Sequence, residues 1–176
     1  QMGLNRRLLA RSLLHESLYQ IRFGEDPSSA SRASRILARL EERDGDAPGM
    51  ELARAADALR RSSLAEAERR LSGARASSQT DAYYYLLVGE LALRAGHSED
   101  AARAFARASE LGAGVRGLWG RARALEHVAS PDYPAALDAV LAASPRHPGA
   151  RLSRARVAAS RGEELDFESY KELAKS

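Results

Sequence analysis

The stretch that decides the fold runs from Ala82 to Val115 and reads AYYYLLVGELALRAGHSEDAARAFARASELGAGV. Gly96 interrupts it, and neither half shows the two-residue alternation rich in Val, Ile and Thr that indicates strands. Each half therefore reads as a helix, and Gly96 marks the turn between them. Outward from Gly89, small residues recur every 33 positions, as Ala56, Ala122 and Ala155. A fixed interval of this length predicts a repeated helical hairpin.

The second helix of each predicted hairpin carries a series of its own. Small residues recur there at intervals of 34 and 35 positions, and larger apolar residues keep step with them. The two series are Ala67, Ala101 and Ala136, and Leu71, Phe105 and Val140. Small residues at matched places let two backbones approach closely, while larger side chains fill the space between hairpins. We expect Phe105 to sit between small residues of adjacent helices.

Pro and Gly residues divide the chain into stretches that we interpret as ten helices, or five hairpins. Asp26 before Pro27, and Asp132 before Pro134, are typical of helix starts. The predicted helices span residues 4–22, 28–43, 49–61, 64–75, 81–95, 98–111, 115–129, 134–143, 149–161 and 166–174. The predicted fold class is all-α.

These hairpins resemble the tetratricopeptide repeat family, most closely over Ala82 to Val115. The positions that carry the resemblance are Tyr85, Val88, Gly89, Ala92, Gly96, Ala101, Phe105 and Ala108. The next unit keeps Leu118, Ala122, Leu125, Tyr133, Ala136, Val140, Ala143 and Pro148. It departs from the pattern by two extra residues in its turn and by Arg121, where an aliphatic residue is usual. The resemblance implies an α-solenoid of about five hairpins that forms a right-handed superhelix.

The repeat pattern also suggests a division of the chain. Residues 1–48 do not extend the period and are interpreted as a divergent hairpin that caps the stack, since a terminal repeat must present a polar outer face. A dimerisation hairpin is the alternative. Tetratricopeptide-like repeats are expected over 49–165, as units of about 49–81, 82–115, 116–148 and 149–165. Residues 166–176 are expected to form a C-terminal capping helix.

Few residues suggest catalysis, metal binding or cofactor binding. The chain has no Cys, which excludes disulfides and cysteine nucleophiles. Its four His residues are scattered singly, and we expect His97 and His147 to be solvated. Nucleophile-elbow, phosphate-loop and zinc-hydrolase motifs are missing. We predict no enzyme, no catalytic residue, no metal site and no cofactor.

The segment Gly112 to Gly117 matches the dinucleotide-binding pattern G-x-G-x-x-G. That function requires a strand before the motif and a helix after it. A helix is predicted before it here, so Gly112 and Gly114 are better explained as helix-capping glycines with positive φ.

Charge and hydropathy restrict the partner and the location. The 176 residues include 27 basic and 24 acidic ones, for a net charge of +3, and acids interleave the bases, so nucleic acid is not an expected partner. The longest apolar candidate, residues 4–23, is broken by charges and predicts no membrane span. Gln1 at the start suggests an excised domain or a mature product. A cytoplasmic location is favoured, and a periplasmic one stays open if a leader precedes Gln1.

The resemblance implies a binding site, because the first helices of such hairpins line a concave groove. The groove residues it implies are Tyr83, Leu86, Glu90, Arg94, Arg116, Trp119, Arg123, His127, Leu152 and Arg156. Trp, Tyr and Arg are enriched among interface hot spots. We therefore predict a protein-interaction module, a scaffold or adaptor, that binds a protein or peptide segment with acidic residues and one apolar anchor.

Two alternatives remain open at this stage. Trp119 can instead belong to the core, with the Arg residues merely solvated. The domain can also serve assembly or oligomerisation in a larger bacterial machine, of the envelope, motility or secretion type, and act through helix edges. The oligomeric state stays open.

Overall fold

The computed structural model describes residue 38 and residues 49–162, and the regular structure in that part is helical throughout. The helices are α3 (Met50–Arg60), α4 (Leu64–Ala74), α5 (Ala82–Arg94), α6 (Ser98–Ala108), α7 (Val115–His127), α8 (Tyr133–Ala143) and α9 (Pro148–Ser160). A 3-10 turn, Arg75–Ser77, follows α4, and a π-helical turn, Ser109–Ala113, follows α6. The predicted all-α class is confirmed for these residues. The predicted helices over 4–22 and 166–174 lie outside the described residues, and the predicted helix over 28–43 is described only at residue 38, so neither predicted cap is described.

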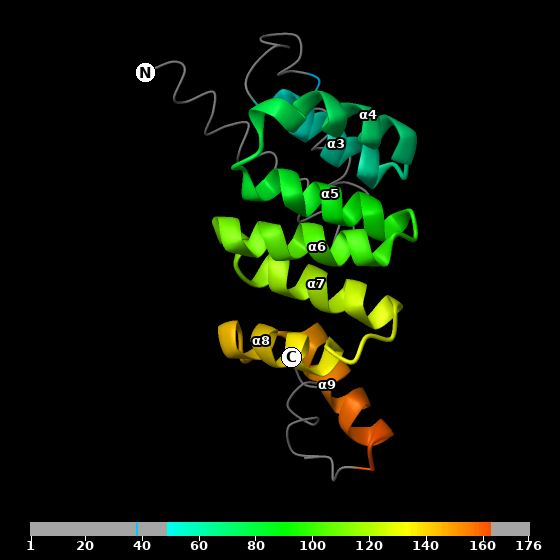
Figure 1. Ribbon diagram of the computed structural model, residues 1–176, viewed down its shortest axis with the longest axis vertical. Coiled ribbons are helices and arrows are strands. Elements are labelled where there is room, and N and C mark those ends of the chain that lie inside the picture. Colours follow the sequence, from blue (N-terminus) through cyan, green and yellow to red (C-terminus); the bar gives the residue numbers. More distant parts are fainter. Residues whose placement is uncertain (1–37, 39–48, 163–176) are drawn as a thin grey trace.

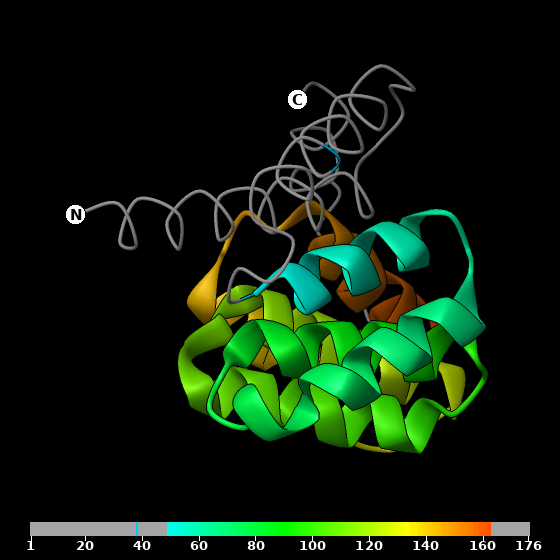
Figure 2. The same ribbon diagram turned by 90° about the horizontal axis from the view of Figure 1, so that it is seen from above.

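The helices stack in chain order. Figure 1 shows α3 and α4 at one end, α5, α6 and α7 below them, and α8 and α9 at the other end. In Figure 2, which looks down on this stack, successive helices overlie one another. Each helix packs against the next along the chain, and α3 and α7 also both contact α5. First helices of neighbouring hairpins therefore form a continuous side of the stack from α3 to α7.

The turns at the ends of the first helices α3, α5 and α7 repeat one geometry. A backbone N–H donates to the carbonyl five residues earlier, as in a Schellman motif. These bonds run from Ser63 to Ala58, from His97 to Ala92 and from Ser130 to Leu125, over 2.8, 2.8 and 2.9 Å. Residues with positive φ recur in these turns and after α9, namely Ser62, Gly96, Ala129 and Gly162. The repeated sequence interval thus corresponds to a repeated backbone conformation.

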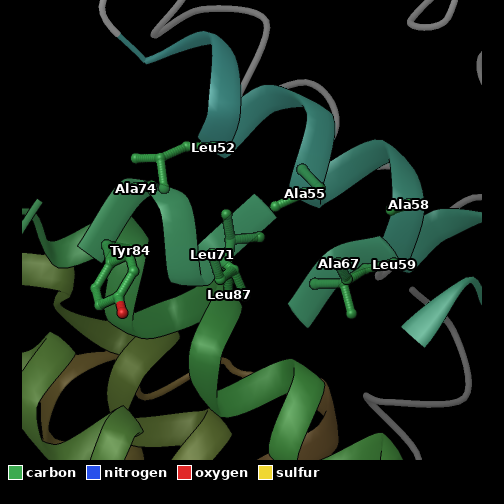
Figure 3. Close-up of a cluster of buried hydrophobic side chains, with 10 residues drawn as sticks. Leu52, Ala55, Ala58, Leu59, Ala67, Leu71, Ala74, Tyr84 and Leu87 are labelled. Carbon is green, nitrogen blue, oxygen red and sulfur yellow. The ribbon is translucent and has the colours of Figure 1, made fainter. Parts of the chain in front are cut away.

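The core consists of separate clusters between consecutive helices. The first cluster lies between α3, α4 and α5, and Figure 3 shows its side chains meeting there. Leu59 and Leu87 are fully buried in it, and Leu71 reaches it from α4. Such contacts supply most of the stability of helices this short, because an isolated helix of about a dozen residues is marginal in water.

Phe105 of α6 is held between two glycines, one from each neighbouring first helix. A Cβ atom added to Gly89 of α5 would lie 2.8 Å from the Phe105 ring, and one added to Gly120 of α7 would lie 2.4 Å from it. The ring is buried, so α5, α6 and α7 can approach closely only because both positions lack a side chain. The expectation that Phe105 sits between small residues is confirmed.

The glycine-rich segment after α6 is a helix-to-helix connection. Gly112 and Gly114 have φ of 93° and 59°, in the region that only glycine adopts without steric cost. A helix and a π-helical turn precede the segment, so the strand that dinucleotide binding requires is not found there. The expectation of capping glycines with positive φ is confirmed.

Candidate binding surface

The first helices α3, α5, α7 and α9 carry two equivalent positions that lie one turn apart. We name the first set the apolar row, which consists of Ala53, Leu86, Trp119 and Leu152. We name the second set the charged row, which consists of Asp57, Glu90, Arg123 and Arg156. Each member lies 33 positions after the previous one. Residues four apart share one face of a helix, so each unit offers one apolar and one charged side chain side by side.

The first member of the charged row is neutralised within its own helix. The Asp57 carboxylate accepts hydrogen bonds from Arg60 at 2.7 Å and from Arg61 at 2.9 Å. Burial by itself raises the pKa of Asp57, but the hydrogen bonds and positive charges of the two guanidinium groups outweigh it and hold the pKa below its usual value. Asp57 is therefore already satisfied as an acceptor.

Glu90 joins three first helices into one network. It accepts hydrogen bonds from Arg94 on its own helix at 2.9 Å and from Arg123 of α7 at 3.3 Å. Arg94 also donates to the carbonyl of Leu59, near the end of α3. A cation at a helix C-terminus interacts favourably with the exposed carbonyls and with the helix dipole. The predicted groove residues Glu90, Arg94 and Arg123 are thus brought together, but they bind one another.

Arg156 is the exception in the charged row. It is exposed and forms no ion pair with any residue of the part that the structure describes. Leu152, one turn earlier on α9, is 41% exposed. The neighbouring Arg154 binds Asp138 of α8 at 3.0 Å, so that side of α9 faces the preceding helix. Arg156 and Leu152 are the row members most accessible to another molecule.

Trp119 has both core and surface character. Its indole packs against the third core cluster, which includes Leu137 and Val140, yet it keeps part of its surface exposed. Its ring centroid lies 4.8 Å from that of His147, and a Cβ atom on Gly149 would lie 2.7 Å from the ring. Trp119 thus packs on the core and also contributes to the surface, and its role in binding a partner stays a prediction.

His147 corrects one expectation. It is half-buried rather than solvated, and its Nδ1 accepts the backbone N–H of Ala150 at 3.2 Å. This bond caps the start of α9, while the ring packs on Trp119. The physical reason is that a ring nitrogen can cap a helix when the ring is held against a neighbouring aromatic. His97 is exposed, as expected.

Tyr133 places a polar group beside the last two hairpins. Burial raises the pKa of its hydroxyl, and the adjacent Glu126 carboxylate raises it further, while Ser153 and the positive charge of Arg156 act in the opposite direction. Arg156 therefore lies near the contact between α8 and α9.

The remaining predicted groove residues fall in different environments. Leu86 is only 6% exposed and belongs to the core cluster of Leu93, Phe105 and Ala124, so it offers a partner little accessible surface. Tyr83 is half-buried and contacts both the first and the second core cluster. Arg116 is also half-buried, and His127 is exposed. The equivalent position of a repeat thus buries its side chain in one unit and exposes it in another.

The described residues contain no group of three or more His, Asp or Glu side chains placed to hold a metal ion. None of the helices over 50–160 is long and apolar enough to cross a membrane.

Comparison with known proteins assigns no family. No protein-family model matches the sequence, and no curated protein matches it at a significant level.

Proposed function

We propose that this chain is a non-enzymatic scaffold of the tetratricopeptide-like kind, an α-solenoid of about five hairpins in a right-handed superhelix that binds a protein partner on its first-helix side. The observation that carries the proposal is the recurrence of positive φ after each first helix, at Ser62, Gly96, Ala129 and Gly162, which lie five residues after Asp57 and six residues after Glu90, Arg123 and Arg156. Each turn directs the chain back in the same way, so equivalent side chains come to one side of the stack. Repeat proteins use extended surfaces built in this way for binding.

The network around Glu90 supports the same proposal. It links Arg94 and Arg123 on neighbouring first helices and so keeps α3, α5 and α7 in a fixed spacing. A preorganised surface loses less conformational entropy when a partner binds.

The test uses two arginines on the same helix. Arg123 belongs to the charged row, whereas Arg121, two residues earlier, is exposed on the opposite side of α7. The immobilised full chain should retain proteins from a lysate of its source organism, and Arg123→Gln should lose them while Arg121→Gln should not. Equal retention by both variants would show that Arg123 and its network with Glu90 do not support binding on the first-helix side. Melting curves of both variants establish that each is folded.

Assembly through helix edges is a second candidate, and Val128 favours it. Val128 directly follows α7 and is 43% exposed, at the turn to α8 and outside the two rows. Light scattering over a range of concentrations separates the two functions. A self-associating domain should gain mass with concentration, and Val128→Asp should abolish the gain.

A further inference from the structure

The apolar row changes from buried to exposed along the stack. Ala53 is 2% exposed and Leu86 is 6% exposed, whereas Trp119 is half-buried and Leu152 is 41% exposed. Hydrophobic side chains at equivalent positions are therefore covered at the α3 end and accessible at the α9 end. Within the apolar row of the described residues, Trp119 and Leu152 therefore offer a partner the most accessible surface.

The charged row changes sign in the same direction. Its first two members, Asp57 and Glu90, are acidic, and their side chains are only 14% and 15% exposed. Its last two members are basic, with the Arg123 side chain 33% exposed and Arg156 exposed. Both acids are neutralised by arginines of this chain, so the charge left uncompensated in the row lies at Arg156.

We infer that the binding site is confined to the α7–α9 end of the first-helix side, and that its partner is an acidic segment with an apolar side chain beside a carboxylate. This inference rests on the proposed function and specifies it. The apolar residue of the partner contacts Trp119 and Leu152. Its carboxylate pairs with Arg156, whose guanidinium can bind a carboxylate through two parallel hydrogen bonds.

The helix spacing sets the pattern that the partner must have. Trp119 and Arg123, and likewise Leu152 and Arg156, are one helical turn apart, which separates their Cβ atoms by about 5–6 Å. An extended peptide rises about 3.3 Å per residue. The matching carboxylate therefore stands two residues from the apolar anchor in an extended partner segment.

The α3–α5 end is unsuited to the same partner. Asp57 and Glu90 already accept hydrogen bonds from arginines of this chain, and displacing Arg94 or Arg123 from Glu90 would break those bonds. The charged row therefore offers a partner's carboxylate a guanidinium that is not already paired only at Arg156, at the α9 end of the described stack.

The test is a selection of random dodecapeptides displayed on phage against the immobilised full chain. We expect the enriched peptides to carry Asp or Glu two residues from an aromatic or large aliphatic residue. One enriched peptide, synthesised with a fluorophore, is then titrated by anisotropy against wild type, Arg156→Glu, Leu152→Ser and the control Arg121→Glu. Both substituted row positions are exposed, so folding should be retained, and melting curves check this.

The expected result is a rise in Kd of about tenfold or more for Arg156→Glu, because the substitution places like charges together, and no change for Arg121→Glu. Leu152→Ser should also weaken binding, and added salt should reduce the affinity of wild type more than that of Arg156→Glu. Enriched peptides that bind Arg156→Glu as tightly as wild type would overturn the inference and leave the proposed function standing. A selection that enriches no peptide would overturn the proposed function itself. A wild-type dimer that Arg156→Glu dissociates would identify a second copy as the occupant and overturn the acidic partner.

Discussion

Ala129 occupies a backbone conformation that costs an L-residue free energy. Its φ is 48°, at the turn position where the equivalent residue of the preceding hairpin is Gly96, with φ of 81°. Adjacent Ser130 donates its N–H to Leu125, so the turn is held in the left-handed region by its own hydrogen bond. Replacing Ala129 with Gly should therefore stabilise the fold.

The magnitude follows from two opposing contributions. The left-handed region costs a non-glycine residue roughly 1–2 kcal/mol. Glycine adds conformational freedom to the unfolded chain, which costs about 0.4–1 kcal/mol. Ala129 is exposed, so removal of its methyl group forfeits little packing. The net expectation for Ala129→Gly is a gain of about 0.5–1 kcal/mol in the free energy of unfolding, or about 1–4 °C in Tm for a chain of this length.

The assay is urea unfolding followed by circular dichroism, with the slope of the transition unchanged so that midpoints report stability alone. Ala139→Gly is the matched control, because Ala139 is exposed in the interior of α8 and the same substitution there should cost about 1 kcal/mol. Gly96→Ala should destabilise by about the amount that Ala129→Gly gains. If Ala129→Gly and Ala139→Gly destabilise equally, the assignment of a strained repeated turn is refuted.

Three further predictions concern the core and the charged row. Phe105→Ala should lower the free energy of unfolding by about 3–5 kcal/mol, measured by thermal unfolding, because the ring fills the space between two glycines. Arg103→Ala, on the exposed side of α6, should leave the stability nearly unchanged. Equal losses of stability would contradict the helix register. Gly120→Ala should lower the free energy of unfolding by about 1–3 kcal/mol through overpacking against the Phe105 ring. Adding Phe105→Leu to this variant should restore part of the lost stability. Additive losses from the two substitutions would show that positions 105 and 120 do not meet. The pKa of Asp57 is held below its unfolded value of 3.8, so its contribution to stability is complete above that pH and is lost as the pH falls below it. Asp57→Asn should therefore make the stability fall less steeply with pH in acid. An unchanged pH dependence of unfolding in acid would contradict the ion pairs with Arg60 and Arg61.

The sequence by itself determined the helices of the described part to within about three residues, because their limits depend on local signals. Glycine and proline positions, together with the spacing of small residues, act through the backbone of neighbouring residues. The predicted stretch 98–111, for example, corresponds to α6 and the π-helical turn that follows it. The contact of Phe105 with small residues was predictable for the same reason, since it follows from matched positions on adjacent helices.

Only the tertiary structure decided which predicted groove residues are accessible. Leu86 and Leu152 hold equivalent positions, yet one is buried and the other exposed, because exposure depends on which helices lie on either side. Glu90 and Arg123 are 33 positions apart, and their pairing depends on the distance between α5 and α7. Opposite charges at equivalent positions of successive repeats were the one signal in the sequence that could have revealed it. Repetition specifies the backbone of each unit, whereas burial and ion pairing depend on the place of each unit in the stack.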